Sequence, residues 1–151
     1  MAGFDCGVSS LNRYLPERAL SDQRAGKSRT YVSLRGDRVV AYFSLAAGSV
    51  VPADATARVA TGQGGQAIPV ILLARLAVDL AEQDRGVGRA MLLDALVRSA
   101  RAAEVIGARA LLVHAASEEA RGFYLRFGFE PSPTNPLHLF LLMKDVRKTL
   151  G

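Results

Sequence analysis

The stretch Gln83-Asp84-Arg85-Gly86-Val87-Gly88-Arg89-Ala90 joins an apolar, strand-like run at residues 70–80 to a helical pattern that continues to about residue 104. Glycines at positions 86 and 88 let the backbone approach a ligand with no Cβ in the way. The first turn of a helix also has N–H groups without intrahelical acceptors, and these groups favour an anion. The stretch therefore predicts a strand, a glycine turn and a helix start that together bind a pyrophosphate.

Two other phosphate-binding motifs fit the chain less well. The dinucleotide pattern G-x-G-x-x-G needs a glycine where Met91 stands, and the strand-like run at 108–113 ends at His114-Ala115, where that pattern places an acid. The P-loop pattern at Gly26-Lys27-Ser28 has Ser21 in place of its first glycine, and it precedes a strand instead of following one. Gly26 is better explained as the residue that ends a helix.

The pattern [Gln/Arg]-x-x-Gly-x-[Gly/Ala], which Gln83, Gly86 and Gly88 satisfy, resembles the acetyl-CoA pyrophosphate loop of the GNAT N-acetyltransferase superfamily. A second segment, residues 117–129, is similar to the signature A-x-x-F-Y-x-x-x-G-F of the same family. Ser117 as N-cap and Gly128 as the stop predict a short helix there. The two motifs occur in the family's order, separated by a helical and a strand-like segment.

The resemblance implies an α/β (α+β) GNAT fold, with a mixed, mostly antiparallel central sheet that is flanked by helices and splayed at the acetyl-CoA groove. It implies acetyl-CoA as the acetyl donor and Tyr124 as the tyrosine that points at the coenzyme sulfur. Taken alone, Tyr124 is also compatible with an ordinary buried ring that has a wet hydroxyl. The implied cofactor-binding residues are Leu76, Ala77, Val78, Gln83, Asp84, Arg85, Gly86, Val87, Gly88, Arg89 and Ala90, and no metal is expected.

Three further segments narrow the resemblance to one GNAT branch, the TacT-like toxins that acetylate aminoacyl-tRNA. They are Phe4-Asp5-Cys6-Gly7, the run Leu11-Asn12-x-Tyr14-Leu15, and residues 128–133 with the apolar strand after Leu137. This branch usually has a strand before Phe-Asp-Cys-Gly, so we expect the first family strand to be missing at the N-terminus. The branch implies an antitoxin with a ribbon-helix-helix DNA-binding domain, and a homodimer.

Length and composition predict a single domain over residues 1–151, because half of the residues are hydrophobic and can form a substantial core. We expect a cytoplasmic protein without membrane association, since the chain has no apolar run of membrane-spanning length and no secretory signal pattern. The lone Cys6 excludes an internal disulfide, and a structural role is expected for it.

The remaining chain predicts helices, a hairpin and a final strand. A helical pattern begins at Leu11, Pro16 suits the first turn of a second helical segment, and Gly26 closes that segment. Residues 30–35 and 39–50 predict a hairpin about Gly36-Asp37. Residues 52–67 predict a flexible loop or marginal helix, and residues 137–143 predict the last strand.

The charge is asymmetric and predicts a nucleic-acid surface or, alternatively, a solvated helix face. Lys and Arg number 19 against 14 Asp and Glu, which gives a net charge of +5. Residues 13–38 hold seven positive and three negative side chains. Phosphate neutralisation needs such a surface. The tRNA-binding candidates are Arg13, Arg24, Lys27, Arg29 and Arg75.

The predicted chemistry is direct transfer of acetyl from acetyl-CoA to the α-amine of aminoacyl-tRNA. An α-amine has a pKa of about 8, so a neutral fraction exists near pH 7 without a strong protein base. His114 is interpreted as a packed or hydrogen-bonded histidine rather than that base. Two alternatives stay open: a GNAT enzyme acting on a small amine or a protein N-terminus, and a non-catalytic acetyl-CoA-binding module.

Overall fold

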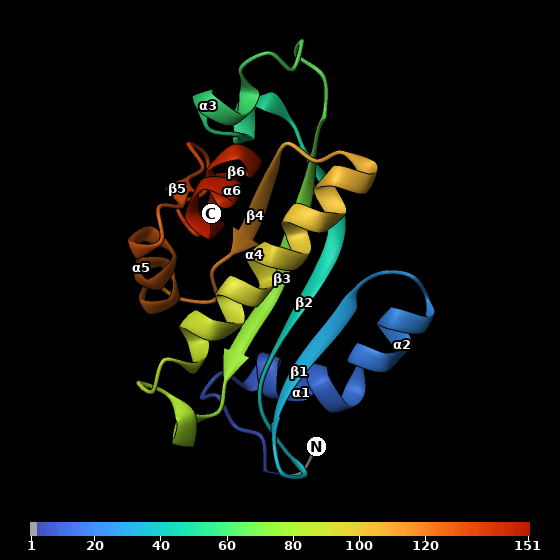
Figure 1. Ribbon diagram of the computed structural model, residues 1–151, viewed down its shortest axis with the longest axis vertical. Helices are drawn as coiled ribbons and strands as arrows, with labels where there is room; N and C mark the ends of the chain where they lie inside the picture. The colour runs from blue at the N-terminus through green and yellow to red at the C-terminus, as the bar shows by residue number, and fades with distance from the viewer. Residues whose placement is uncertain (1–2) are drawn as a thin grey trace. The chain divides into compact units, whose positions relative to one another are not determined.

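The computed structural model describes residues 3–151, which form a mixed α/β arrangement around a six-stranded sheet (Figure 1). The strand order is β1-β2-β3-β4-β6-β5. In chain order the elements are α1 (Ser9–Glu17), α2 (Ala19–Arg24), β1 (Arg29–Arg35), β2 (Arg38–Val50), the 3-10 helix η1 (Pro52–Asp54), α3 (Ala57–Ala60), β3 (Ile68–Val78), the 3-10 helix η2 (Leu80–Glu82), α4 (Val87–Ile106), β4 (Ala110–His114), α5 (Glu118–Arg126), β5 (Glu130–Pro131), β6 (His138–Leu142) and α6 (Met143–Leu150).

The chain divides into two compact units, and β2, β3 and α4 each pass from one unit to the other along the chain. The first unit holds the described residues up to Ala46 together with Ala74–Ala95. The second unit holds Ala47–Leu73 and Leu96–Gly151. The pyrophosphate-loop motif therefore lies in the first unit, and the helix with Tyr124 lies in the second.

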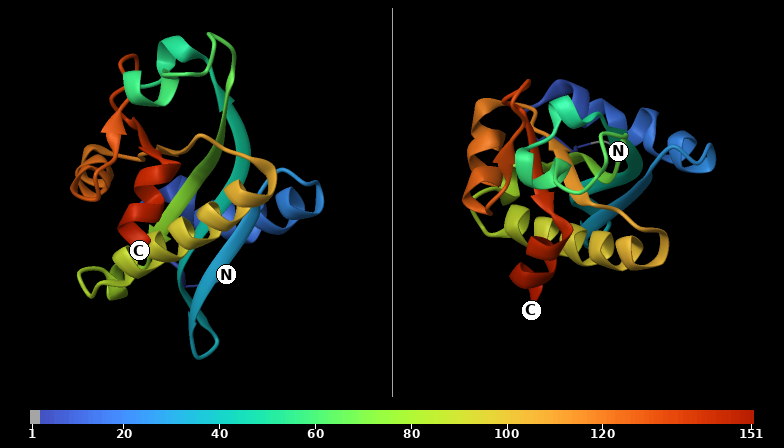
Figure 2. Two further views of the ribbon diagram at one scale, coloured as in Figure 1. Left: turned by 45° about the horizontal axis from the view of Figure 1, so that its top comes forward. Right: turned by 90° about the horizontal axis from the view of Figure 1, so that it is seen from above.

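The first unit contains two helices and the predicted hairpin (Figure 2), together with the end of β3, η2 and the start of α4. β1 and β2 pair antiparallel from Arg29↔Leu45 to Arg35↔Arg38, and Gly36 turns the chain with a φ of 64°. Gly26 has a φ of 75° and ends α2, which confirms its predicted role. The core of this unit contains Phe4, Cys6, Tyr14, Ala19, Val39, Tyr42 and Ala77.

The prediction for Pro16 is wrong, because Pro16 lies inside the last turn of α1 and not in the first turn of the next helix. Pro16 has no N–H to donate to the carbonyl four residues earlier, and the helix ends one residue after it. The Arg18 N–H then donates to the Tyr14 carbonyl at 2.9 Å. Arg18, with a φ of −130°, then separates α1 from α2. Residues 3–28 contain these two helices and no strand.

The second unit is centred on β4, which pairs parallel with β3 over Val70–Leu73 and antiparallel with β6 along its whole length. β4 has five residues. The first four are apolar and buried, and His114 at the end is exposed. The short β5 pairs antiparallel with β6. The core contains Ala55, Val59, Ile68, Val70, Ala110, Leu112, Phe140 and Leu142.

The sequence predicts the start of one helix in this unit, α5, but not the start of another, α6. Ser117 caps α5 as expected, since its Oγ accepts from the Ala120 N–H at 3.1 Å. α6 was not expected: the predicted strand at 137–143 ends at Leu142, and Met143 begins a helix. Within residues 3–151, no helix combines the length and the hydropathy needed to span a bilayer.

Candidate active site

The predicted pyrophosphate loop forms a turn at residues 83–86 that leads directly into α4. Gly86 has a φ of 82°, and an added Cβ would meet no atom within 4 Å, so this space at the helix start is open to a ligand. α4 runs for 20 residues without an acidic side chain in its first turn. Its first N–H groups are therefore available to an anion, and no carboxylate competes for them.

The turn is braced by a side chain that the sequence assigned to the cofactor. The Gln83 amide Nε2 donates to the Val78 carbonyl at 2.9 Å and to the Cys6 carbonyl at 3.3 Å. The next residue, Asp84, adopts a left-handed φ of 64° that side chains rarely take. The amide of Gln83 thus holds the turn in shape.

Ion pairs from Arg35 and Arg38 fix the segment that precedes the loop. The buried Glu82 carboxylate accepts from Arg35 at 2.7 Å and from Arg38 at 3.4 Å, and the Arg35 guanidinium holds the Glu82 pKa below its ordinary value. Asp79, also buried, accepts from the Ala81 N–H at 2.9 Å. These contacts anchor the end of β3 to the hairpin of the first unit, and they give the loop a rigid base.

The β3 residues implied in acetyl-CoA binding lie at the end of that strand, four residues before the turn begins. Ala77 is buried, whereas Leu76 and Val78 are half-buried. A backbone carbonyl in this run, that of Val78, is already used by Gln83. That Leu76, Ala77 and Val78 contact acetyl-CoA stays a prediction.

The Tyr124 ring packs against two aromatic side chains, and its hydroxyl has no hydrogen-bond partner within residues 3–151. The side chain is 5 % exposed. Its ring meets those of Phe123 and Phe129 edge-on, with centroids 5.2 and 5.4 Å away. In the part of the chain that the structure describes, no hydrogen bond to this hydroxyl is found. Buried tyrosines usually satisfy their hydroxyls, so this group is available for a bound molecule.

The five predicted tRNA-binding cations divide into two kinds. Arg13 bonds Ser9 Oγ at 2.8 Å and approaches Glu17, and the Arg75 guanidinium lies 3.5 Å above the Tyr14 ring. The other three are exposed, and no ion pair to them is found within residues 3–151. These three are Arg24, Lys27 and Arg29, here called the 24–29 cation patch. Unpaired exposed cations bind phosphate most readily because no carboxylate must be displaced.

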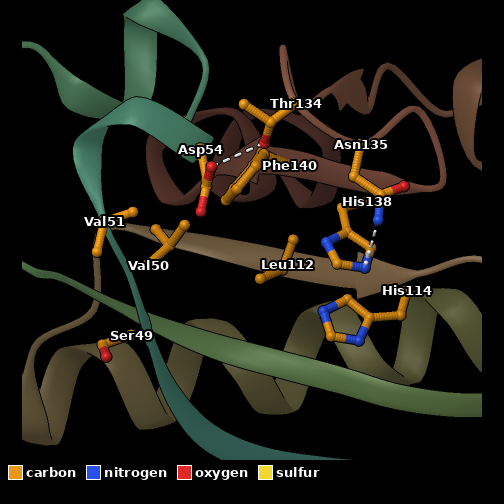
Figure 3. Close-up of a pocket in the computed structure, with 10 residues that line it drawn as sticks. All are labelled: Ser49, Val50, Val51, Asp54, Leu112, His114, Thr134, Asn135, His138 and Phe140. Atoms are coloured by element: carbon orange, nitrogen blue, oxygen red, sulfur yellow. Dashed lines mark hydrogen bonds between the residues drawn. The ribbon is translucent and has the colours of Figure 1, made fainter.

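The structure adds a pocket of about 460 Å³ in the second unit that the sequence did not predict (Figure 3). It lies between the end of β2, η1, the strands β4 and β6, and the loop before β6. The apolar part of its lining is Val50, Val51, Leu112 and Phe140, and the polar part is Ser49, Asp54, His114, Thr134, Asn135 and His138.

His114 and His138 stack at one end of this pocket, with ring centroids 3.9 Å apart and planes inclined by 15° (Figure 3). They meet because the antiparallel register of β4 and β6 pairs them directly. Partial burial, and secondly the neighbouring His138, lower the His114 pKa from its ordinary 6.5. The sequence could not reveal this pair, since the register of two strands that are 24 residues apart decides it.

The fold, the glycine turn and the buried tyrosine agree with one family of enzymes. The model of the acetyltransferase (GNAT) domain matches residues 26–131. The chain therefore belongs to the GNAT acetyltransferases, and it is an N-acetyltransferase with acetyl-CoA as donor.

Among named proteins, the chain is similar over its full length to a tRNA-acetylating toxin of Mycobacterium tuberculosis. The two sequences are 52 % identical over 151 residues, which cover 100 % of this chain and 90 % of the relative. This resemblance also covers residues 1–25 and 132–151, which lie outside the GNAT domain match.

Solved toxin structures have the same fold. A Tyr→Phe mutant of KacT superposes with a TM-score of 0.91 at 28 % identity, covering 97 % of this chain and 89 % of that one. AtaT complexed with acetyl-methionyl-tRNA gives 0.87 at 26 % identity, covering 98 % and 90 %. A Tyr→Phe mutant of AtaT bound to acetyl-CoA and the C-terminus of the antitoxin AtaR gives 0.83 at 27 % identity, covering 97 % and 88 %.

Proposed function

We propose that this enzyme transfers acetyl from acetyl-CoA to the α-amine of an amino acid esterified to tRNA, and that it thereby acts as a translation-blocking toxin. The observation that carries the proposal is the full-length similarity to a tRNA-acetylating toxin, which includes the segments outside the GNAT domain match. AtaT, a structural neighbour, is known in complex with an acetylated aminoacyl-tRNA.

In this proposal the glycine turn holds the coenzyme pyrophosphate. The N–H groups at the start of α4 supply the donors, and Arg85 and Arg89 supply positive charge beside them. The backbone near Leu76 contacts the pantetheine arm and holds the developing oxyanion.

Tyr124 stabilises the departing sulfur by donating a hydrogen bond. Its reference pKa of about 10 exceeds that of a thiol, about 8.5, so full proton transfer is uphill by roughly 2 kcal/mol. Burial raises the Tyr124 pKa further, which keeps the hydroxyl protonated and able to donate. The absence of a competing hydrogen-bond partner among residues 3–151 favours this role. KacT and AtaT are both known as Tyr→Phe mutants.

The proposed partners follow from the same relatives. The 24–29 cation patch contacts the tRNA backbone, while Arg13 and Arg75 take a smaller part because other side chains already hold them. An antitoxin covers the active surface, as AtaR binds AtaT. We expect this antitoxin to carry a ribbon-helix-helix domain, the toxin to form a homodimer, and both to act in the cytoplasm.

Incubation with labelled acetyl-CoA and a mixed pool of charged tRNA tests the proposal. We expect label on charged tRNA and none on deacylated tRNA, together with growth arrest when the enzyme is expressed alone. Label on polyamines or peptide N-termini in place of charged tRNA would identify a small-amine or protein acetyltransferase. Tight acetyl-CoA binding without any transfer would indicate a non-catalytic module.

A further inference from the structure

The pocket beside the histidine pair has the composition of a site for an amino acid. Val50, Leu112 and Phe140 supply an apolar wall, and the Asp54 carboxylate supplies an anionic group at its rim (Figure 3). The rim is fixed, since Thr134 Oγ1 donates to Asp54 Oδ1 at 2.8 Å and Ser132 Oγ donates to the Asp54 carbonyl at 2.6 Å. Apolar walls with a few placed polar groups are typical of small-ligand sites.

The hydrogen bonds around Asn135 determine which histidine is free. Asn135 Oδ1 accepts from the Leu137 N–H at 3.0 Å, so the amide nitrogen of Asn135 faces His138 Nε2 at 3.3 Å. An amide nitrogen only donates, and His138 Nε2 is therefore the acceptor, with the proton on Nδ1. No hydrogen bond to the His114 ring is found within residues 3–151. His114 is the member of the pair with a lone pair open to a ligand.

The pocket is connected to the helix that carries Tyr124. Arg121 Nε, one turn before Tyr124 in α5, donates to the Pro136 carbonyl at 2.8 Å. Pro136 lies between Asn135 and His138, which line the pocket. The residue after β4 is bonded to the same loop before β6, because the Ala115 N–H donates to the Leu137 carbonyl at 2.7 Å.

We propose that this pocket is the acceptor site for the aminoacyl group, and that His114 receives the proton that the attacking α-amine loses. The inference rests on the proposed function and assigns a catalytic residue that the sequence interpretation had set aside. His138 is a positioning residue: its ring stacks on His114, and Asn135 keeps its own Nε2 occupied.

The proposed step balances in atoms and charge. The neutral amine attacks the thioester carbon, the N–C bond forms, and the C–S bond breaks with its electron pair leaving on sulfur. The nitrogen becomes positively charged and strongly acidic as it bonds, so even a weakly basic imidazole accepts its proton. His114 then releases that proton to solvent, and Tyr124 donates a hydrogen bond to the thiolate.

Few ionisable groups face His114 in this pocket. η1 contributes Asp54 and β6 contributes His138, while the lining residues of β2 and of the loop before β6 carry no ionisable side chain. A lowered His114 pKa leaves the imidazole neutral at pH 7. As the pH falls through that pKa, His114 becomes protonated and can no longer accept, so activity on charged tRNA must fall.

The test is the pH dependence of kcat/KM for charged tRNA, measured for wild type, His114→Gln and His138→Gln. Wild type needs both a neutral amine and a neutral imidazole. A plot of log kcat/KM against pH should therefore rise with slope two below the His114 pKa, and with slope one between that pKa and the pKa of the amine. His114→Gln should lose about 100-fold or more at pH 7, within the range for a general base, and keep slope one throughout.

His138→Gln separates catalysis from packing. This variant should lose less than about tenfold in kcat/KM and retain the slope of two at low pH. The part of the profile with slope two should extend to higher pH, because one cause of the lowered His114 pKa is gone. Acetyl-CoA affinity should be unchanged in His114→Gln, and the melting temperature should change little, because His114 lies at the exposed end of β4 and loses only its contact with the His138 ring.

A His114→Gln profile that runs parallel to wild type would overturn the inference while leaving the proposed function intact, because charged tRNA would still be acetylated. An equal loss in both variants would overturn it as well, since that would indicate a packing role. Wild-type enzyme that does not acetylate charged tRNA would overturn the proposed function, and the inference with it.

Discussion

Tyr124 combines deep burial with a hydroxyl that has no hydrogen-bond partner within residues 3–151, and this combination separates it from Tyr14 and Tyr42 of the first unit. Tyr14 donates to Asp22 at 3.0 Å and Tyr42 donates to the Leu11 carbonyl at 2.7 Å, so both hydroxyls are satisfied. Tyr124 has two aromatic neighbours but no hydrogen-bond partner within residues 3–151. The contrast supports a structural role for the first two and a chemical role for Tyr124.

Tyr124→Phe should retain acetyl-CoA affinity and lose about 100-fold or more in kcat, because it removes only the donor to the departing sulfur. The ring packing should survive, so the melting temperature should change little. Calorimetric titration with acetyl-CoA and single-turnover acetyl transfer measure the two effects. The matched control is Tyr14→Phe, which removes a satisfied hydroxyl and should reduce stability more than turnover. Full turnover in Tyr124→Phe would remove this residue from the mechanism.

The glycine turn before α4 gives a prediction about an element. Gly86→Val should raise KM for acetyl-CoA by about tenfold or more, because a side chain fills the space at the helix start and opposes the left-handed φ of 82°. Gly36→Val is a matched control, since Gly36 also has a positive φ and open space but lies in the hairpin turn. Equal KM values for the two variants would contradict the loop assignment.

Arg109 holds the short helix α3 in place and allows a prediction about stability. Its guanidinium donates to the carbonyls of Val59 at 3.1 Å, Arg58 at 2.8 Å and Thr61 at 3.2 Å. Arg109→Ala should lower the free energy of unfolding by about 2 kcal/mol, as expected for hydrogen bonds from a charged donor. Urea denaturation measures this change. Arg101→Ala, an exposed residue of α4, should change stability by less than about 0.5 kcal/mol.

The elements that the sequence predicted well have local signals. Gly36 reverses a hairpin, Gly26 ends α2, and Ser117 caps α5, and each acts through its own backbone or side chain. α6 has no such signal: its N-cap Leu142 makes no side-chain bond, and no glycine or proline separates it from β6. Burial of Met143 and Val146 stabilises this short helix, and that is a tertiary effect.

In the candidate site, too, features with a local sequence signal could be predicted and features that depend on tertiary contacts could not. Tyr124 and the glycine turn could be located because they belong to contiguous motifs. The histidine pair could not, because it depends on the register of β4 with β6 and on the amide of Asn135. The tRNA candidates were located by composition, but only the fold distinguishes Arg75, stacked on Tyr14, from the unpaired 24–29 cation patch.

At the scale of the whole molecule, the net charge of +5 predicts salt-sensitive binding of tRNA. Changing Arg24, Lys27 and Arg29 to Ala should weaken tRNA binding and reduce the slope of log K against log salt by about 2, at about 0.7 to 0.9 per lost phosphate contact. Filter binding across a salt series measures both quantities. The control changes Arg101, Lys144 and Lys148 to Ala, which alters the net charge equally. Identical slopes for the two triple variants would place the tRNA elsewhere.

The position of the acetyl group on the product tests the central proposal most directly. Charged tRNA that has been incubated with enzyme and labelled acetyl-CoA is digested with ribonuclease, and the released aminoacyl-adenosine is identified by mass spectrometry. We expect N-acetyl-aminoacyl-adenosine, formed by wild type and lost in Tyr124→Phe. Label on a nucleobase, or label that appears equally on deacylated tRNA, would contradict an enzyme that acetylates the α-amine of aminoacyl-tRNA.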